Sequence, residues 1–164
     1  WWALTVFITK VIIIPWLLFT YIRKLPKVEV TPLIGYTLSI SILSIILIVL
    51  YKFVHTFIEF IAPTPEAMAE PARSCLTLSF MIFALGLYAL VVRKDAVKIV
   101  IGVCLLENGV HLSLMALAPG LPETTVIGIA TNVVIATWLL LYLTGRIFKT
   151  LGSTDTSILS ELKR

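Results

Sequence analysis

Charged residues are scarce in this sequence. Asp, Glu, Lys and Arg make up 13% of its 164 residues, whereas hydrophobic residues make up 59%. A soluble domain draws roughly a quarter of its residues from the four charged types, because its surface must be wetted. The scarcity therefore excludes a soluble globular domain. Since a membrane-spanning helix takes about 20 apolar residues, a chain of this length holds about five spans and their short connections.

Cysteine is equally scarce. The two cysteines, Cys75 and Cys104, stand in apolar stretches without CxxC or CxxH spacing, which predicts neither a disulfide framework nor a metal site. The sequence also has no glycine-rich phosphate loop. We assign the net charge of +4 to basic loops on one membrane face and expect no nucleic-acid partner.

Long apolar runs fill most of the chain and are separated by proline, glycine and charged residues. Each run is too long and too continuously apolar for a barrel strand, so the sequence predicts an all-α, polytopic membrane helix bundle. Because the first run is under way at Trp1, without Met or signal-peptide order, we expect further sequence upstream. The predicted spans are residues 1–22, 33–51 with a tail to 61, 76–92, 96–118 and 126–148.

Basic residues gather in three regions that alternate onto one membrane face. The opposite face receives mainly acidic residues, so the positive-inside rule predicts a cytoplasmic C-terminus and an outside location for the first residue. The bases are Arg23, Lys24, Lys27, Arg93, Lys94, Lys98, Arg146, Lys149, Lys163 and Arg164, and the opposite loops carry Glu59, Glu66, Glu70, Glu123 and Arg73.

The tail of the second run is amphipathic. Lys52, His55, Thr56 and Glu59 recur at helical spacing, with Phe53, Phe57, Phe60 and Ile61 on the other side. This pattern is typical of an interfacial segment with a solvated face. A proton exit or a docking stripe for a partner subunit is the alternative.

The fourth span holds a polar group within a continuous apolar helix. Glu107 and His111 are four residues apart, so they share one helix face, with Cys104 one turn before and Asn108 beside them. Ionisable groups in hydrocarbon are costly and face protein or water. Because histidine and a buried carboxyl can both exchange protons near neutral pH, we expect a relay here. The alternative is a pair that only tightens helix packing.

The first span carries Lys10 in mid-run, five residues before Pro15. Proline removes the helical donor for the carbonyl of Val11, which predicts a kink and a polar niche beside the lysine. A lysine in such a niche suits a proton relay, whereas a lysine that extends to the interface has no such role. In the last span Asn132 is a candidate for lining a wet path, although small residues there favour packing.

The strings LLENGVHL, IGIATN and TDTSILSELKR, with FITKVIIIP near the start, resemble component E of hydrogenase-4 over nearly the whole chain. That component is a membrane subunit of group 4 [NiFe] hydrogenases of the formate-hydrogenlyase type. The last three spans are similar, more distantly, to complex I subunit K and to the C subunit of multisubunit Na+/H+ antiporters. The resemblance implies two N-terminal helices in residues 1–62, a loop at 63–75, a subunit-K-like three-helix unit at 76–150 and a cytoplasmic tail at 151–164.

Members that resemble complex I carry a carboxylate in each of two helices. Aligned on Ile101-Gly102, the first falls at Cys104, and Glu107 stands one turn later on the same face. The second has no acidic counterpart, because Asn132 follows the Ala-Thr of IGIAT where component E is expected to carry an acid. A water chain or a neighbouring subunit would have to replace it.

The resemblance implies a non-catalytic subunit in a prokaryotic cell membrane, next to antiporter-like subunits, that helps move protons or sodium-coupled protons. The nickel–iron centre and the iron–sulfur clusters are expected in partner subunits, because this chain lacks cysteine ligands for them. We expect the path to use Glu107, His111 and Lys10, with Asn108, Asn132 and Lys98 as further lining residues. The alternatives are a scaffold between antiporter-like subunits, a subunit of complex I or of an antiporter, and a stand-alone transporter.

Overall fold

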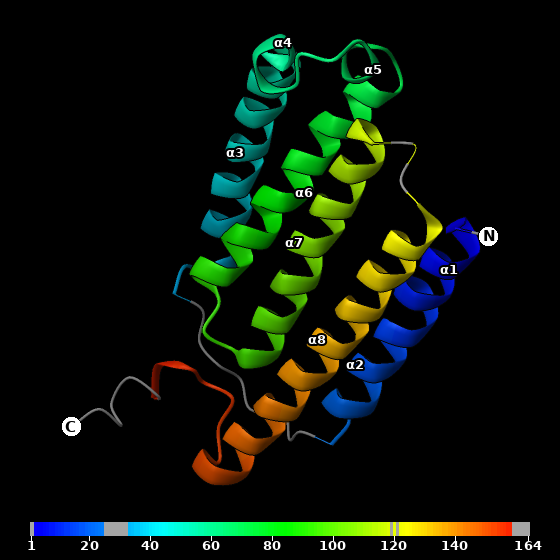
Figure 1. Ribbon diagram of the computed structural model, residues 1–164. Coiled ribbons are helices and arrows are strands. Elements are labelled where there is room, and N and C mark those ends of the chain that lie inside the picture. The colour runs from blue at the N-terminus through cyan, green and yellow to red at the C-terminus, as the bar shows by residue number, and fades with distance from the viewer. Residues whose placement is uncertain (1, 25–32, 119, 121, 159–164) are drawn as a thin grey trace. The chain divides into compact units, whose positions relative to one another are not determined.

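The computed structural model describes residues 2–24, 33–118, 120 and 122–158, and within these ranges the regular elements are all helices (Figure 1). Five of them are long and apolar enough to cross a membrane, which confirms the predicted all-α membrane bundle. The elements are α1 (Trp2–Phe7), the π-helix η1 (Ile8–Ile13), α2 (Ile14–Ile22), α3 (Tyr36–Thr56), α4 (Ile58–Ile61), α5 (Pro65–Met68), α6 (Ala72–Val92), α7 (Ala96–Leu117) and α8 (Glu123–Leu151).

The chain divides into two compact units that do not follow the order of the sequence. The first comprises residues 1–31, 94–100 and 121–164, and so contains α1, η1, α2, α8 and the beginning of α7. The second comprises residues 32–93 and 101–120, with α3 to α6 and the rest of α7.

In the second unit α3 runs beside α6. Ser39 Oγ and Tyr88 Oη lie 2.8 Å apart and join the two helices near one end. At the other end the Arg73 guanidinium donates to the carbonyl oxygen of His55 at 2.6 Å, close to the C-terminus of α3. This end also contains the unit's core cluster, which consists of Val54, Ile58, Ala62, Ala67, Leu76 and Ala116.

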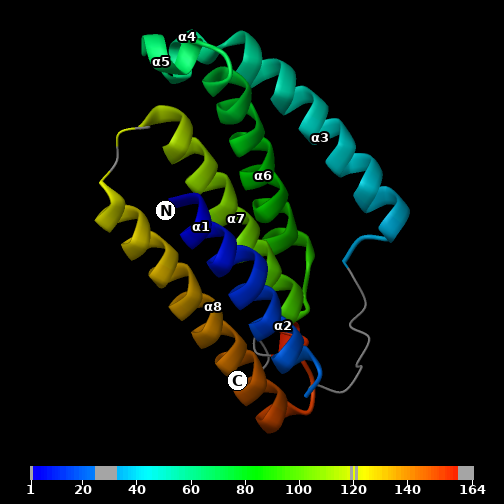
Figure 2. The same cartoon turned by 90° about the vertical axis from the view of Figure 1, so that its right-hand side faces the viewer.

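In the first unit the opening span packs against α8, and the two helices run side by side in both views (Figures 1 and 2). The buried positions on α8 recur at intervals of three and four residues, as expected for one face of a helix. Thr9 and Ile14 are buried on the opening span. The buried α8 residues are Ala130, Val133, Thr137, Leu141 and Thr144.

The segment after α8 folds back onto the beginning of α7. Gly152 ends α8 with a left-handed backbone (φ 68°), a conformation that glycine adopts without steric cost. The amide of Ala96 then donates to the carbonyl of Thr154 at 3.0 Å. Both the amide and the hydroxyl of Thr156 donate to the carbonyl of Lys94, at 2.9 and 2.8 Å. The polar tail is therefore attached to the loop that precedes α7.

Candidate functional site

The polar residues of α7 are carried by a helix whose backbone touches that of α6. A Cβ atom added at Gly86 would lie 2.7 Å from the Leu106 amide nitrogen, and one added at Gly109 would lie 2.8 Å from the Phe83 amide nitrogen. Such distances are too short for any side chain, so both positions require glycine. The two contacts hold α7 against α6 immediately before and after Glu107.

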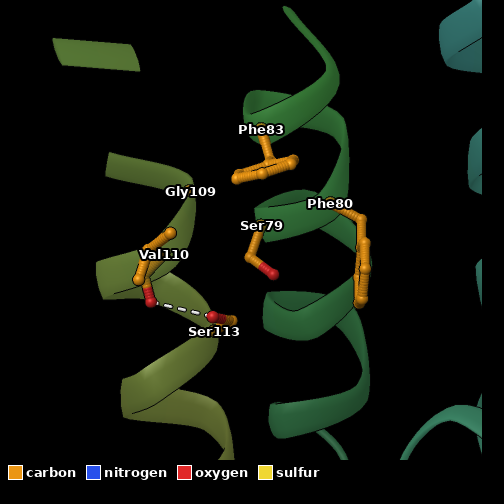
Figure 3. A pocket seen from close by; sticks show the side chains of 6 residues that line it. All are labelled: Ser79, Phe80, Phe83, Gly109, Val110 and Ser113. Carbon is orange, nitrogen blue, oxygen red and sulfur yellow. Dashed lines mark hydrogen bonds between the residues drawn. The ribbon is translucent and has the colours of Figure 1, made fainter. Parts of the chain in front are cut away.

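A cavity of about 160 Å³ opens between these two helices, next to Gly109. Figure 3 shows Ser79 of α6 and Ser113 of α7 on either side of the gap, with Phe83 across one end. Each serine hydroxyl donates to a carbonyl of its own helix, Ser79 to Leu76 and Ser113 to Val110. The hydroxyl donors are therefore used within each helix, and the cavity offers mainly methylene and aromatic surface.

The candidate proton-path residues of α7 face away from α6. The residues that contact or face α6 are Gly102, Leu106, Gly109 and Ser113. At about 100° per residue, Glu107, Asn108 and His111 lie on the opposite side of the helix, together with Cys104. All four are half-buried. The partner for this polar face is thus not α6.

His111 makes a hydrogen bond within its own helix. Its Nδ1 atom lies 2.9 Å from the main-chain carbonyl oxygen of Glu107, one turn earlier. Because a carbonyl oxygen only accepts, Nδ1 must carry a hydrogen, and in the neutral ring Nε2 is then the nitrogen without a hydrogen. His111 can therefore gain and lose a proton at Nε2 while the Nδ1 bond remains in place.

Lys10 lies in the π-helix η1. The opening span accommodates Pro15 by forming this π-helix. The Ile14 amide donates to the carbonyl of Thr9, five residues earlier, instead of four. Lys10 is half-buried, and Thr9 beside it lines a cavity of about 260 Å³ together with Thr5 and residues of α8. A niche with hydroxyl groups therefore lies one residue from the lysine.

The remaining candidates, Asn132 and Lys98, also belong to the first unit. Asn132 is exposed and lies on the side of α8 away from its buried residues. Lys98 is half-buried in the first turn of α7, where Asp95 Oδ1 accepts from the Val97 amide at 2.9 Å and begins the helix. Glu107, Asn108 and His111 are therefore grouped on one helix of the second unit, and Lys10, Lys98 and Asn132 belong to the first.

The amphipathic tail of the second span forms as a broken helix. A turn at Phe57 separates α3 from α4, and the side chains buried there are Val54 and Ile58. Lys52 and Glu59 are exposed, as expected for a solvated face. Phe60 on the other side is 86% exposed, a value that suits contact with lipid or a partner chain.

Two features of the site were not predicted from the sequence. Gly102 and Gly109 are seven residues apart, and so are Ser79 and Gly86, a spacing of small residues that allows close helix contact. That signal was available in the sequence but does not say which helices meet. The attachment of the C-terminal tail through the Lys94 and Thr154 carbonyls had no sequence signal, because main-chain groups supply both acceptors and two of the three donors.

In a comparison with known proteins, residues 74–164 match the family model described as NADH-ubiquinone/plastoquinone oxidoreductase chain 4L. The chain is 31% identical to hydrogenase-4 component E of Escherichia coli K12 over 163 residues, which cover 99% of this chain and 72% of that protein. It is 24% identical to an uncharacterized protein of Mycobacterium tuberculosis, over 98% of this chain and 71% of that protein. No solved structure matches it.

Proposed function

The chain belongs to the NADH-ubiquinone/plastoquinone oxidoreductase chain 4L family and to the hydrogenase-4 component E family, and from this membership we propose that it is a non-catalytic membrane subunit of a group 4 [NiFe] hydrogenase complex. In that complex it takes part in moving protons, or sodium-coupled protons, through the membrane arm. Hydrogen chemistry and electron transfer belong to partner chains that hold the nickel–iron centre and the iron–sulfur clusters.

The observation that carries the proposal is the polar face of α7. Glu107, Asn108 and His111 stand within an apolar span, are half-buried, and turn away from the helix to which α7 is bound through glycine contacts. An ionisable group at this depth is costly, so it is retained where it meets protein groups or water. A stripe that plays no part in packing α7 on α6 is suited to exchanging protons with a neighbouring chain.

In the proposed path a proton moves laterally between neighbouring subunits through Glu107 and Nε2 of His111. Lys10 changes its charge in response, and Asn108, Lys98 and Asn132 help to hold water. Antiporter-like subunits lie on either side in the membrane arm. The positive-inside rule, applied to the basic regions, favours a cytoplasmic C-terminus, and the membrane proposed is the cell membrane of a prokaryote.

The test replaces Glu107 by Gln, which keeps the size of the side chain and removes its titration. In inverted membrane vesicles, we expect H2 evolution to continue while proton pumping per H2 falls at least about tenfold, since titratable groups speed proton transfer by ~10²–10⁴. The matched control is E59Q, which changes an exposed carboxylate on α4. Equal pumping in both variants would remove Glu107 from the mechanism.

A scaffold role is the second candidate, supported by the large unburied surface of the spans. In the five spans found among the described residues, at most 28% of the residues in the most apolar stretch are buried. A scaffold predicts that E107Q pumps normally and that Glu107→Ala loses complex assembly, which co-purification of the membrane subunits measures. A stand-alone transporter instead predicts that the chain elutes without partners.

A further inference from the structure

We propose that the basic ends of α2 and α8 form a binding site for the headgroup of an anionic phospholipid. A cavity of about 260 Å³ lies between these two helices, within the first unit. Three of the residues that line it are the cations Lys24, Arg146 and Lys149, and no acidic residue in the described part of the chain lines it. Like charges that line one cavity repel one another, and an anion bound between them relieves that repulsion.

The position of the cavity along the spans favours a lipid over other anions. The opening span ends at Ile22, two residues before Lys24. The last span runs from Ile127 to Leu151, and its 25 residues at ~1.5 Å each exceed the ~30 Å hydrocarbon core, so its final turns reach the headgroup layer. Lysine and arginine at this depth attract anionic headgroups.

The cavity walls have the amphipathic character that a lipid requires. Tyr21 and Tyr142 line it, and Tyr21 lies under the Lys24 ammonium with 5.9 Å between the nitrogen and the ring centroid. Tyrosine is typical of the membrane interface, where its ring meets acyl chains and its hydroxyl meets headgroups. One turn deeper on α8, Trp138 stacks with Tyr142 and is 47% exposed. The basic end therefore continues into an open apolar stripe along which an acyl chain can lie.

The floor of the cavity on α8 is Gly145. A Cβ atom added there would meet nothing within 4 Å, so the space above this glycine is open. Arg146 and Lys149 are exposed beside it and present donors to that space. A phosphodiester bound here would accept hydrogen bonds from a guanidinium and two ammonium groups, with its glycerol backbone near the tyrosines.

The test uses the assembled complex in nanodiscs of phosphatidylcholine with phosphatidylglycerol. A photoactivatable phosphatidylglycerol should label peptides of α2 and α8, and unlabelled phosphatidylglycerol should compete whereas phosphatidylcholine and inorganic phosphate should not. In R146Q/K149Q we expect labelling to fall about 30-fold, at about fivefold for each charge lost. The control R23Q/K94Q removes two bases outside the cavity lining and should label normally.

A second variant separates a built site from general attraction to a basic surface. G145L keeps every charge but fills the cavity, and leucine favours the helix more than glycine does. We expect G145L to abolish labelling of α2 and α8. If R146Q/K149Q fails to assemble, G145L alone tests whether the lipid binds in this cavity. Normal labelling in G145L, equal losses in the two double variants, or competition by inorganic phosphate would each overturn the proposal.

Discussion

The hydrogen bond between His111 and Glu107 joins a ring nitrogen to a main-chain oxygen. Nδ1 of His111 therefore bonds the main-chain carbonyl of Glu107 and not its side-chain carboxylate. This bond orients the ring through Nδ1, so in the proposed path proton exchange is assigned to Nε2. In the proposed path orientation therefore rests on Nδ1 and titration on Nε2, and a variant can change one without the other.

We expect His111→Asn to assemble normally and to pump at least about tenfold more slowly than the wild type. The asparagine amide nitrogen can take the place of Nδ1 and donate to the Glu107 carbonyl, but it cannot titrate, and proton relays lose ~10²–10⁴ in rate without a titrating group. Proton uptake per H2 in inverted vesicles measures the effect. Ser113→Ala, on the α6 side of the same helix, is the control, and wild-type pumping by the asparagine variant would contradict the relay.

Sequence spacing correctly predicted that Glu107 and His111 share one face of the helix, because residues four apart on a helix lie one above the other. It could not predict which atoms meet. That choice depends on the side-chain rotamer of His111, and the Glu107 turn offers both a carbonyl and a carboxylate as acceptors. The roles of Glu107, His111 and Lys10 in ion movement stay predictions.

At the scale of helices, the contact between α6 and α7 is decided by glycine. We expect Gly86→Ala and Gly109→Ala to lower stability by roughly 1–3 kcal/mol, because the new methyl group would overlap backbone atoms of the facing helix. Gly102→Ala should cost less, since its nearest neighbour is the Ala89 side chain at 3.2 Å. Thermal unfolding of the complex in detergent measures the series.

The control for this series is Gly128→Ala on α8. A Cβ atom there meets nothing within 4 Å, and alanine favours a helix over glycine by about 1 kcal/mol, so this variant should be neutral or more stable. Equal effects at positions 86, 102, 109 and 128 would show that the close approach of α6 and α7 does not govern stability.

The C-terminal tail is a second element whose attachment can be tested. Two donors of Ser157, its hydroxyl at 2.7 Å and its amide at 2.9 Å, bind Asp155 Oδ1 and hold the pKa of that carboxyl below its usual value. A lowered pKa means that the folded tail favours the ionised form. Its contribution to stability is complete above the usual pKa and is lost as the pH falls through the lowered value.

We therefore expect acid to loosen the tail at pH values below about 4, the usual pKa of an aspartate. Hydrogen exchange of the Ala96 and Thr156 amides, which bond across the attachment, should accelerate there more than in D155N. The asparagine variant should show weaker protection at neutral pH and little further change in acid. The same pH profile in both proteins would contradict the role given to Asp155.

The five spans were predictable from hydrophobic length, and each candidate span lies within a few residues of its predicted range. Two features were not predictable. Pro15 indicated a distortion, but the π-helical form over Ile8–Ile13 depends on local backbone geometry. The pairing of α3 with α6 could not be predicted from the sequence either. Spans that are apolar on all sides give little signal about which face contacts which neighbouring helix.

At the scale of the whole molecule, most of the apolar surface remains open. Between 11% and 28% of the residues in the most apolar stretch of each described span are buried, and side chains such as Val91 and Ile40 are 74% and 65% exposed. Lipid alone can cover an apolar side chain, but a polar one such as exposed Asn132 is better covered by protein or water. The chain thus has the surface of a subunit within a larger membrane assembly.

The central claim is that Glu107 exchanges a proton while the complex turns over. Infrared difference spectra of the intact complex, with and without H2 turnover, measure the carbonyl stretch of protonated carboxyl groups directly. The account predicts a carboxyl band that appears or disappears with turnover in the wild type and in E59Q, and that is missing in E107Q. A carboxyl spectrum that is identical in wild type and E107Q would contradict it.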